Sequence, residues 1–168
     1  MNLDHVFKKT KKALRKREST TTVPDGLLCR CSRCKKPILV QEVRDAYYIC
    51  PKCGGYFKVR AYERIRRVAD EGTFQESDRE LVGENPLGFE GYEEKLAAER
   101  LKTRMKEAIV TGTGSIDGIP AALGVMDSRF MMASMGWAVG EKLTRLIEKA
   151  TTENLPLILF TCSGGARM

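Results

Sequence analysis

Two pairs of cysteines constrain the fold of this 168-residue chain more than any other feature of its sequence. The stretch "CSRC" supplies Cys31 and Cys34, and "CPKC" supplies Cys50 and Cys53. A Cys-x-x-Cys turn directs two thiolates at one ion, and two such turns complete a tetrahedron. The spacing between the two pairs is typical of a zinc ribbon. We predict one zinc ion bound by these four residues, with buried structural thiols or an iron site as the alternatives.

A further cysteine makes the choice of the first ligand less direct. Cys31 has the two-residue spacing to Cys34, whereas Cys29 would leave four residues between the ligands. We therefore interpret Cys29 as a spare thiol and expect Cys162 to be free as well. Four thiolates leave no open position for water, so we expect a structural zinc that folds a segment too small to have its own core.

The net charge of +7 is concentrated in the N-terminal third of the chain. Residues 1–18 carry +5 and residues 26–60 carry +6, whereas residues 61–168 carry −3. A solvated tail and a charged small module account for this distribution. The alternative is contact with an acidic partner, a nucleic acid or the phosphates of a coenzyme. The negative balance of residues 61–168 argues against an extended nucleic-acid surface there.

The start of the chain does not have the pattern of a secretory signal. The stretch "MNLDHVFKKTKKALRKR" is basic but lacks an apolar segment, and the longest apolar runs of the chain are too short to span a bilayer. We expect a cytoplasmic protein without membrane contact. In a reducing compartment, six cysteines favour metal binding over disulfides.

The chain divides into three segments in this interpretation. Residues 1–24 are a basic flexible tail that ends near Pro24 and Gly26. Residues 25–60 are the four-cysteine zinc ribbon, with short strands between the cysteine pairs. Residues 61–168 have the alternating pattern of an α/β domain, in which a strand, a helix and a second strand with a short crossover predict parallel pairing.

The third segment contains several expected elements, two of which are joined by the hairpin signal Asp117-Gly118. We predict helices over 62–72, 92–108 and 136–154, strands over 108–116, 119–127 and 156–162, and a connecting loop over 75–92.

The C-terminal stretch "LPLILFTCSGGARM" places two glycines directly after a strand. His5 is the sole histidine of the chain, so Ser–His and Cys–His catalysis are excluded, and no phosphate-binding P-loop is present. The backbone N–H groups of Gly164 and Gly165 could instead hold an oxyanion or phosphate oxygens, and Arg167 adds a planar fork for an anionic group. The structural alternatives are that Gly-Gly is only a turn and that the side chains of "FMMASM" only pack in the hydrophobic core.

Several stretches, taken together and in order, resemble the carboxyltransferase β subunits of bacterial acetyl-CoA carboxylases over about residues 23–168. They are "PDGLLCRCSRC", "CPKCGGYF", "DEGTF", "NPLGF", "VMDSRFMMASMGWAVGEK" and "LPLILFTCSGGARM". Ala133, Trp137 and Cys162 depart from the family pattern, which usually has Gly, Ser and Ala there. Family members continue past "SGGARM", so the chain is expected to stop inside its catalytic domain.

The resemblance implies a crotonase-like (ClpP/crotonase) α/β domain behind the zinc ribbon. It also implies an enzyme subunit that transfers the carboxyl group from carboxybiotin on its carrier protein to acetyl-CoA, giving malonyl-CoA for fatty acid synthesis. The implied partners are a carboxyltransferase α subunit, a biotin carboxyl carrier protein and a biotin carboxylase. The base is expected to be the biotin itself after it has lost its carboxyl group, so no histidine is required.

The same resemblance assigns site residues. Gly164 and Gly165 are expected to donate backbone N–H groups, while Ser163, Ala166 and Arg167 contact the acyl-CoA, with Gly136 at the neighbouring helix start. A second Gly-Gly turn and the α subunit are expected to supply further donors, so the chain alone is expected to be inactive. The alternative function is a zinc-ribbon nucleic-acid-binding module with an appended α/β domain.

Overall fold

The computed structural model describes residues 26–167. The basic tail predicted over residues 1–24 lies outside the described residues. The chain forms two compact units, one up to Gly55 and one from Tyr56 onward, and each is described here by itself.

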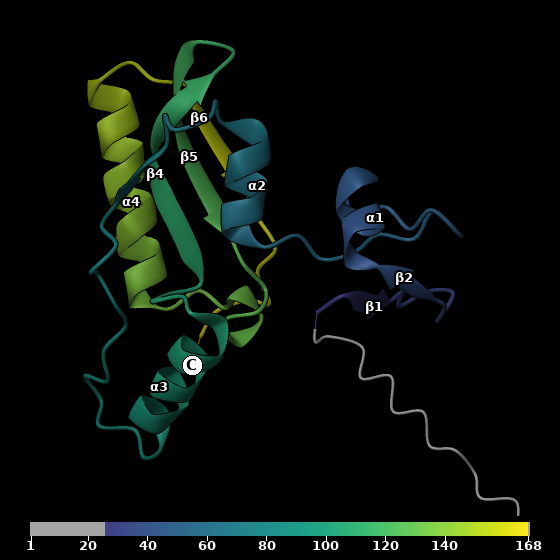
Figure 1. The fold of residues 1–168 in the computed structure, drawn as a ribbon. Coiled ribbons are helices and arrows are strands. Elements are labelled where there is room, and N and C mark those ends of the chain that lie inside the picture. Colours follow the sequence, from purple (N-terminus) through teal and green to yellow (C-terminus); the bar gives the residue numbers. More distant parts are fainter. Residues whose placement is uncertain (1–25, 168) are drawn as a thin grey trace, which may run out of the picture. The chain divides into compact units, whose positions relative to one another are not determined.

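The smaller unit is built on a two-stranded antiparallel sheet (Figure 1). Strands β1 (Leu28–Arg30) and β2 (Pro37–Leu39) pair with Cys29 opposite Ile38. Helix α1 (Val40–Asp45) follows directly, although the sequence predicted only short strands in this segment. The helix buries Val43. It is stabilised by a 2.8 Å hydrogen bond from Gln41 Nε2 to Asp45 Oδ1, an i,i+4 contact that forms only when these residues are helical.

The larger unit contains a mixed four-stranded sheet in the order β3-β4-β5-β6. Its strands are β3 (Gln75–Ser77), β4 (Ile109–Ile116), β5 (Ile119–Met126) and β6 (Leu157–Phe160). Its helices are α2 (Ala61–Val68), α3 (Tyr92–Thr103), the short 3-10 helix η1 (Met131–Ala133) and α4 (Trp137–Thr152).

The predicted hairpin and the predicted parallel pair are both confirmed. Strands β4 and β5 pair antiparallel up to Ile116 opposite Ile119, and the two turn residues have φ values of 51° at Asp117 and 78° at Gly118. This left-handed pair is the conformation of a two-residue hairpin turn. Strand β6 returns through α4 and pairs parallel to β5, with Val125 opposite Phe160.

Strand β5 lies between two helices that cover opposite faces of the sheet (Figure 1). A Cβ added at Gly124 would lie 3.2 Å from Leu146 of α4, so this position faces α4. The next residue, Val125, points to the other face and shares a cavity wall with Arg64 of α2. Burial on both faces explains why the strand is apolar along its last six residues.

The helix predicted over residues 62–72 ends four residues early, at Val68. Ala69 is already extended, and Asp70 is held by the β4–β5 hairpin. Its carboxylate accepts hydrogen bonds from the N–H groups of Asp117 at 3.0 Å and Gly118 at 2.8 Å, and its own N–H donates to Ser115. These contacts join residues more than 40 positions apart, so helix propensity alone could not place the helix end.

Two other boundaries also differ from the prediction. The expected loop over 75–92 contains β3, whose three residues pair antiparallel with β4 from Thr111 to Thr113. The helix expected over 92–108 ends at Thr103, and Arg104 adopts a left-handed conformation with φ 58°. The hydroxyl of Thr103 caps this end because it donates to Glu99 O and accepts from Met105 N. Residues 105–108 then connect this end of the helix to β4.

Within residues 26–167, none of the helices is both long and apolar enough to cross a membrane.

Candidate functional site

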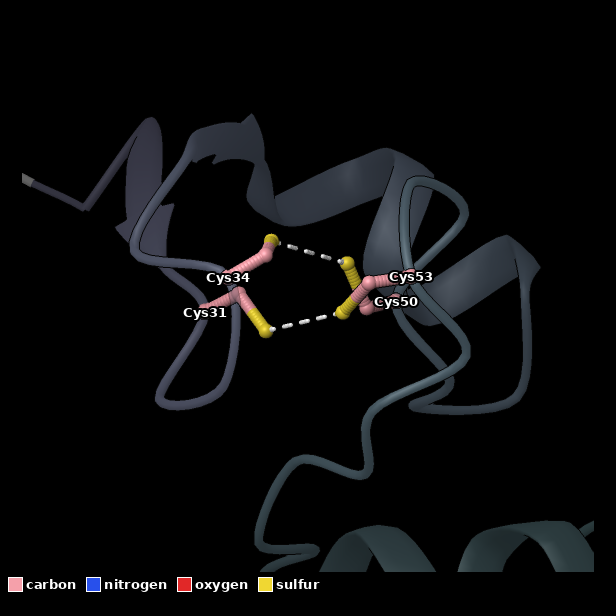
Figure 2. Close-up of side chains that lie close together, drawn as sticks. All are labelled: Cys31, Cys34, Cys50 and Cys53. Carbon is pink, nitrogen blue, oxygen red and sulfur yellow. Dashed lines mark hydrogen bonds between the residues drawn. The ribbon is translucent and has the colours of Figure 1, made fainter.

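The four cysteines of the two Cys-x-x-Cys turns come together at one point of the smaller unit (Figure 2). The Sγ atoms of Cys31 and Cys53 are 3.7 Å apart, those of Cys34 and Cys50 are 3.8 Å apart, and all four lie within 4.8 Å of one another. No disulfide joins these four cysteines, since all four are free thiols. Four sulfur atoms converging at this separation fit the tetrahedral thiolate shell that zinc prefers.

The two turns share one backbone design. The carbonyl of Cys31 accepts the N–H of Lys35 at 3.0 Å, and the carbonyl of Cys50 accepts the N–H of Gly54 at 2.9 Å. The residue after each second cysteine is left-handed, with φ 60° at Lys35 and φ 68° at Gly54. Glycine adopts this conformation without strain at position 54, whereas Lys35 adopts it against the preference of a residue with a Cβ.

The cysteines differ in pKa: the backbone N–H of Gly55 lowers the pKa of Cys53, but burial and the neighbouring thiols outweigh it and raise that pKa to about 11. Backbone N–H groups of Cys34 and Arg33 outweigh burial and lower the pKa of Cys31 to about 6. Cys31 and Cys50 are fully buried, so their thiols are shielded from solvent. Cys29 lies outside this cluster, where its Sγ donates to the carbonyl of Ile38 at 3.6 Å, and burial raises its pKa. Cys162 is exposed and free.

The Gly-Gly turn lies at the carboxyl end of β6, against the segment that precedes α4. Met135 forms a parallel bridge with Ala166, in which Met135 N donates to Gly165 O at 2.8 Å and Arg167 N donates to Met135 O at 2.9 Å. The turn is therefore held by backbone contacts on both sides of Ala166. The neighbouring helix start, Gly136, is the residue that caps α4.

Both predicted N–H donors have partners within the chain in this structure. The N–H of Gly164 donates to the carbonyl of Met132 at 2.9 Å, and the N–H of Gly165 donates to the hydroxyl of Ser163 at 3.0 Å. The two bonds differ in kind. The first joins two backbone segments, whereas the second is a local contact with an exposed side chain.

The sequence predicted that Arg167 binds an anionic group of a ligand, and in the structure its guanidinium contacts an internal carboxylate. Its side chain is only 3% exposed. Nη1 and Nη2 donate to the carboxylate of Glu107 at 3.1 and 2.6 Å, and Nη2 also donates to Ser134 O at 2.8 Å. The guanidinium therefore has internal partners in this structure, and its contact with the acyl-CoA stays a prediction.

Glu107 is the partner that sequence reasoning missed. It was assigned to the end of a helix, but it lies just before β4 with 1% of its surface exposed. Besides Arg167, it accepts the N–H groups of Gly83 and Ala108. A lone acidic residue directly before an apolar strand was the available signal. Gly136 packs on the same guanidinium, since an added Cβ would lie 3.2 Å from Arg167 Nη1.

The segment between β5 and α4 is only partly core filling. Phe130 and Ala133 are fully buried, whereas Met132 is 73% exposed and Trp137 is 62% exposed. Ala133 has φ 54°, a conformation that glycine adopts without strain. The left-handed φ explains why the family usually has glycine at this position, where this chain has alanine. Trp137 lines a shallow cavity together with Phe89 and Arg167.

Comparison with known proteins places this geometry in a family. The pattern of the carboxyl transferase domain family matches residues 58–168. The chain is 51% identical over 163 residues to the acetyl-coenzyme A carboxylase carboxyl transferase subunit beta of Carboxydothermus hydrogenoformans, which covers 96% of this chain and 58% of that protein. It is also 52% identical over 146 residues to the acetyl-coenzyme A carboxylase carboxyl transferase subunits beta/alpha of Natranaerobius thermophilus. That alignment covers 87% of this chain and 24% of the relative.

Among solved structures, a transcarboxylase 12S chain crystallised with methylmalonyl-coenzyme A matches with a TM-score of 0.57 and 26% identity, covering 66% of this chain and 19% of that chain. This likeness confirms the predicted crotonase-like α/β fold. The chain spans little more than half the length of the β-subunit relative. The relatives confirm the resemblance to acetyl-CoA carboxylase β subunits that the sequence indicated. The chain therefore belongs to the carboxyl transferase domain family.

Proposed function

We propose that this chain acts as the β subunit of an acetyl-CoA carboxylase carboxyltransferase, which moves the carboxyl group of carboxybiotin to acetyl-CoA and forms malonyl-CoA. The observation that carries the proposal is the 51% identity to a β subunit over 96% of the chain. The family match over residues 58–168 includes the Gly-Gly turn. The family match disfavours the alternative of a nucleic-acid-binding module with an appended α/β domain.

The proposed partner is a carboxyltransferase α subunit. One relative carries the beta and alpha subunits in a single protein, which supports a functional unit made of both. A biotin carboxyl carrier protein and a biotin carboxylase are proposed as the remaining partners, since carboxybiotin must be formed and delivered. We also propose a cytoplasmic location, where acetyl-CoA is available as substrate.

The chemistry at the turn requires an oxyanion site. Removing a proton from the acetyl methyl group produces an enolate, whose oxygen is stabilised by positioned N–H donors. We propose Gly165 as the donor, because its present acceptor is the exposed Ser163 hydroxyl at 3.0 Å and a charged oxygen forms the stronger hydrogen bond. Gly164 then has a structural role, since its N–H holds the turn to Met132.

The proposal needs no side-chain base in this chain. Its sole histidine is His5, which lies outside the described residues. The proton of the acetyl methyl group is proposed to pass to the decarboxylated biotin of the carrier protein. What the chain's own residues contribute is the placement of the acyl group at residues 163–166 and the orientation of the N–H donor.

The cysteine cluster is proposed to bind one structural zinc ion through Cys31, Cys34, Cys50 and Cys53. The thiol geometry supports this, and a closed four-thiolate shell supplies stability without taking part in carboxyl transfer. An iron site would have the same ligands, and metal analysis separates the two.

The experiment that tests the function uses the chain extended to the length of its β-subunit relatives and mixed with an α subunit. Carboxybiotin and acetyl-CoA are supplied, and malonyl-CoA is measured. We expect turnover only when both subunits are present, and none from the 168-residue chain alone. Retention of the 168-residue chain on CoA-agarose and on heparin, each as a function of salt, provides an independent comparison. Stronger retention on heparin together with no malonyl-CoA from the mixture would reverse the proposal.

A further inference from the structure

A small polar cavity of about 70 Å³ is lined by residues of α2, α4, the β3 region and the segment that enters β4. None of residues 163–167 lines it. Its lining includes six charged side chains: Glu76, Arg79, Arg104, Lys106, Glu107 and Lys142. The cavity is large enough for several water molecules or for one small polar ligand.

Lys142 is the buried cation of this cavity. It is only 1% exposed although it lies on α4, and its ammonium group makes no hydrogen bond or ion pair with any of residues 26–167. Burial lowers the pKa of Lys142, and the nearby carboxylates of Glu76, Glu107 and Asp78 oppose that shift. The ammonium is not fully enclosed by protein atoms, so it opens onto the cavity, and its hydrogen-bond acceptor is expected there.

The two carboxylates of the lining are already engaged elsewhere. Both oxygens of Glu107 accept hydrogen bonds from Arg167 and from backbone N–H groups. Both oxygens of Glu76 lie within hydrogen-bond distance of the Tyr62 hydroxyl, at 3.2 and 3.0 Å. Neither carboxylate forms an ion pair with Lys142 in the part of the chain that the structure describes.

The other cations of the lining lie in exposed residues. Lys106 is paired with Glu80, but the guanidinium groups of Arg79 and Arg104 form no ion pair with a described residue. Lys106 and Glu107 are neutralised by their own ion-pair partners. The lining then has three further cations (Lys142, Arg79 and Arg104) and one further carboxylate, that of Glu76. The cavity therefore has an excess of positive charge.

We propose that this cavity binds a small oxyanion of phosphate size, with Lys142 as the buried ligand and the two arginines as cationic groups nearer solvent. An oxyanion would supply both the hydrogen-bond acceptor that Lys142 lacks and the negative charge that the lining lacks. Water would supply only the first. This site goes beyond carboxyl transfer and does not depend on it.

The test is a titration of the 168-residue protein with inorganic phosphate, followed by calorimetry at constant ionic strength in a chloride buffer. We expect saturable binding to the natural chain, and thermal stabilisation that increases with phosphate concentration. Lys142→Met should abolish both effects, and the double variant Arg79→Gln/Arg104→Gln should weaken binding by about tenfold or more. The matched control is Lys149→Met, which removes an exposed lysine from the same helix and should leave phosphate binding unchanged.

The arginine variant keeps the test decisive if Lys142→Met does not fold, because both arginines are exposed. Equal phosphate binding by the natural chain and the double arginine variant would overturn the proposal. So would the absence of any saturable response in the natural chain, which would mean that the cavity holds only solvent. Neither result would bear on the malonyl-CoA assay, so the two proposals fail separately.

Discussion

Arg167 Nη2 lies 2.6 Å from Glu107 Oε1, and this buried pair joins the end of the Gly-Gly turn to the entrance of β4. The guanidinium also lies 5.5 Å from the ring centre of Phe130. Because both side chains are almost fully buried, neither charge can be hydrated if its partner is removed. The pair therefore fixes the position of the turn relative to the rest of the larger unit.

Removing one partner of this pair should destabilise the larger unit. Glu107→Ala leaves the Arg167 guanidinium buried without its carboxylate, which typically costs about 3–5 kcal/mol. Urea unfolding followed by circular dichroism measures the loss. Glu80→Ala is the control, because its ion pair with Lys106 is exposed and should change the free energy of unfolding by less than about 1 kcal/mol. Equal effects of the two variants would contradict the anchoring role.

Asp127 should make the larger unit sensitive to acid. Burial acts to raise the pKa of Asp127, but hydrogen bonds from the Arg129 guanidinium and from the N–H groups of Ala61 and Arg129 outweigh it and keep that pKa below its usual range. A carboxyl group with a lowered folded-state pKa contributes stability that is present above its unfolded pKa, about 3.9, and is lost as the pH falls through the folded value.

Asp127→Asn should therefore lower the free energy of unfolding at neutral pH by roughly 1–3 kcal/mol. The reason is that the 2.8 Å hydrogen bond from Ala61 N to Asp127 Oδ2 at the start of α2 loses its charged acceptor. The same variant should show a smaller decline in stability below about pH 4 than the natural chain. Thermal unfolding across pH 3–7 checks both statements, and parallel pH profiles would show that Asp127 does not titrate in this way.

The cysteine cluster should fold only with its metal. Cys34→Ser removes one of four ligands, and structural zinc contributes on the order of 10 kcal/mol to modules of this size, so residues 27–60 should lose their structure. Metal analysis and amide exchange of these residues measure the effect. Cys29→Ser is the matched control and should retain one zinc per chain, because Cys29 lies outside the cluster. Loss of zinc from Cys29→Ser with full retention in Cys31→Ser would reverse the ligand assignment.

Gly165→Val should disrupt the turn without affecting the metal. Nothing lies within 4 Å of a Cβ at Gly165, so the expected effect does not come from a clash. It comes from the φ of 111°, which a β-branched residue adopts only with strain. In the extended chain with its α subunit, we expect turnover to fall by about 10²–10³, the typical loss when an oxyanion donor is displaced. Malonyl-CoA formation is measured alongside zinc content.

Gly140→Ala is the control for this substitution, because Gly140 lies within α4, has open space at its Cβ position and is not in the left-handed region. Alanine is the better helix former there, so stability should rise slightly and turnover should be unchanged. A fully active Gly165→Val enzyme would remove the turn from the proposed mechanism.

The features that could be predicted from the sequence are those that depend on local spacing. The two Cys-x-x-Cys turns bring four thiols together because each turn depends on a few consecutive residues. The hairpin at Asp117-Gly118 and the crossover through α4 were predictable for the same reason, since turn conformation and helical periodicity are short-range properties. The family resemblance rests on ordered local stretches of this kind.

The partners of the groups near the Gly-Gly turn became known only from long-range contacts in the folded chain. Arg167 and Glu107 are 60 positions apart, and the guanidinium fork that suggested a ligand site is filled because folding buries the two side chains together. The end of α2 is set in the same way, because the Asp70 carboxylate accepts hydrogen bonds from a hairpin more than 40 residues away. A buried charge or N–H group must find a partner wherever the fold provides one, and the pattern of neighbouring residues does not contain that information.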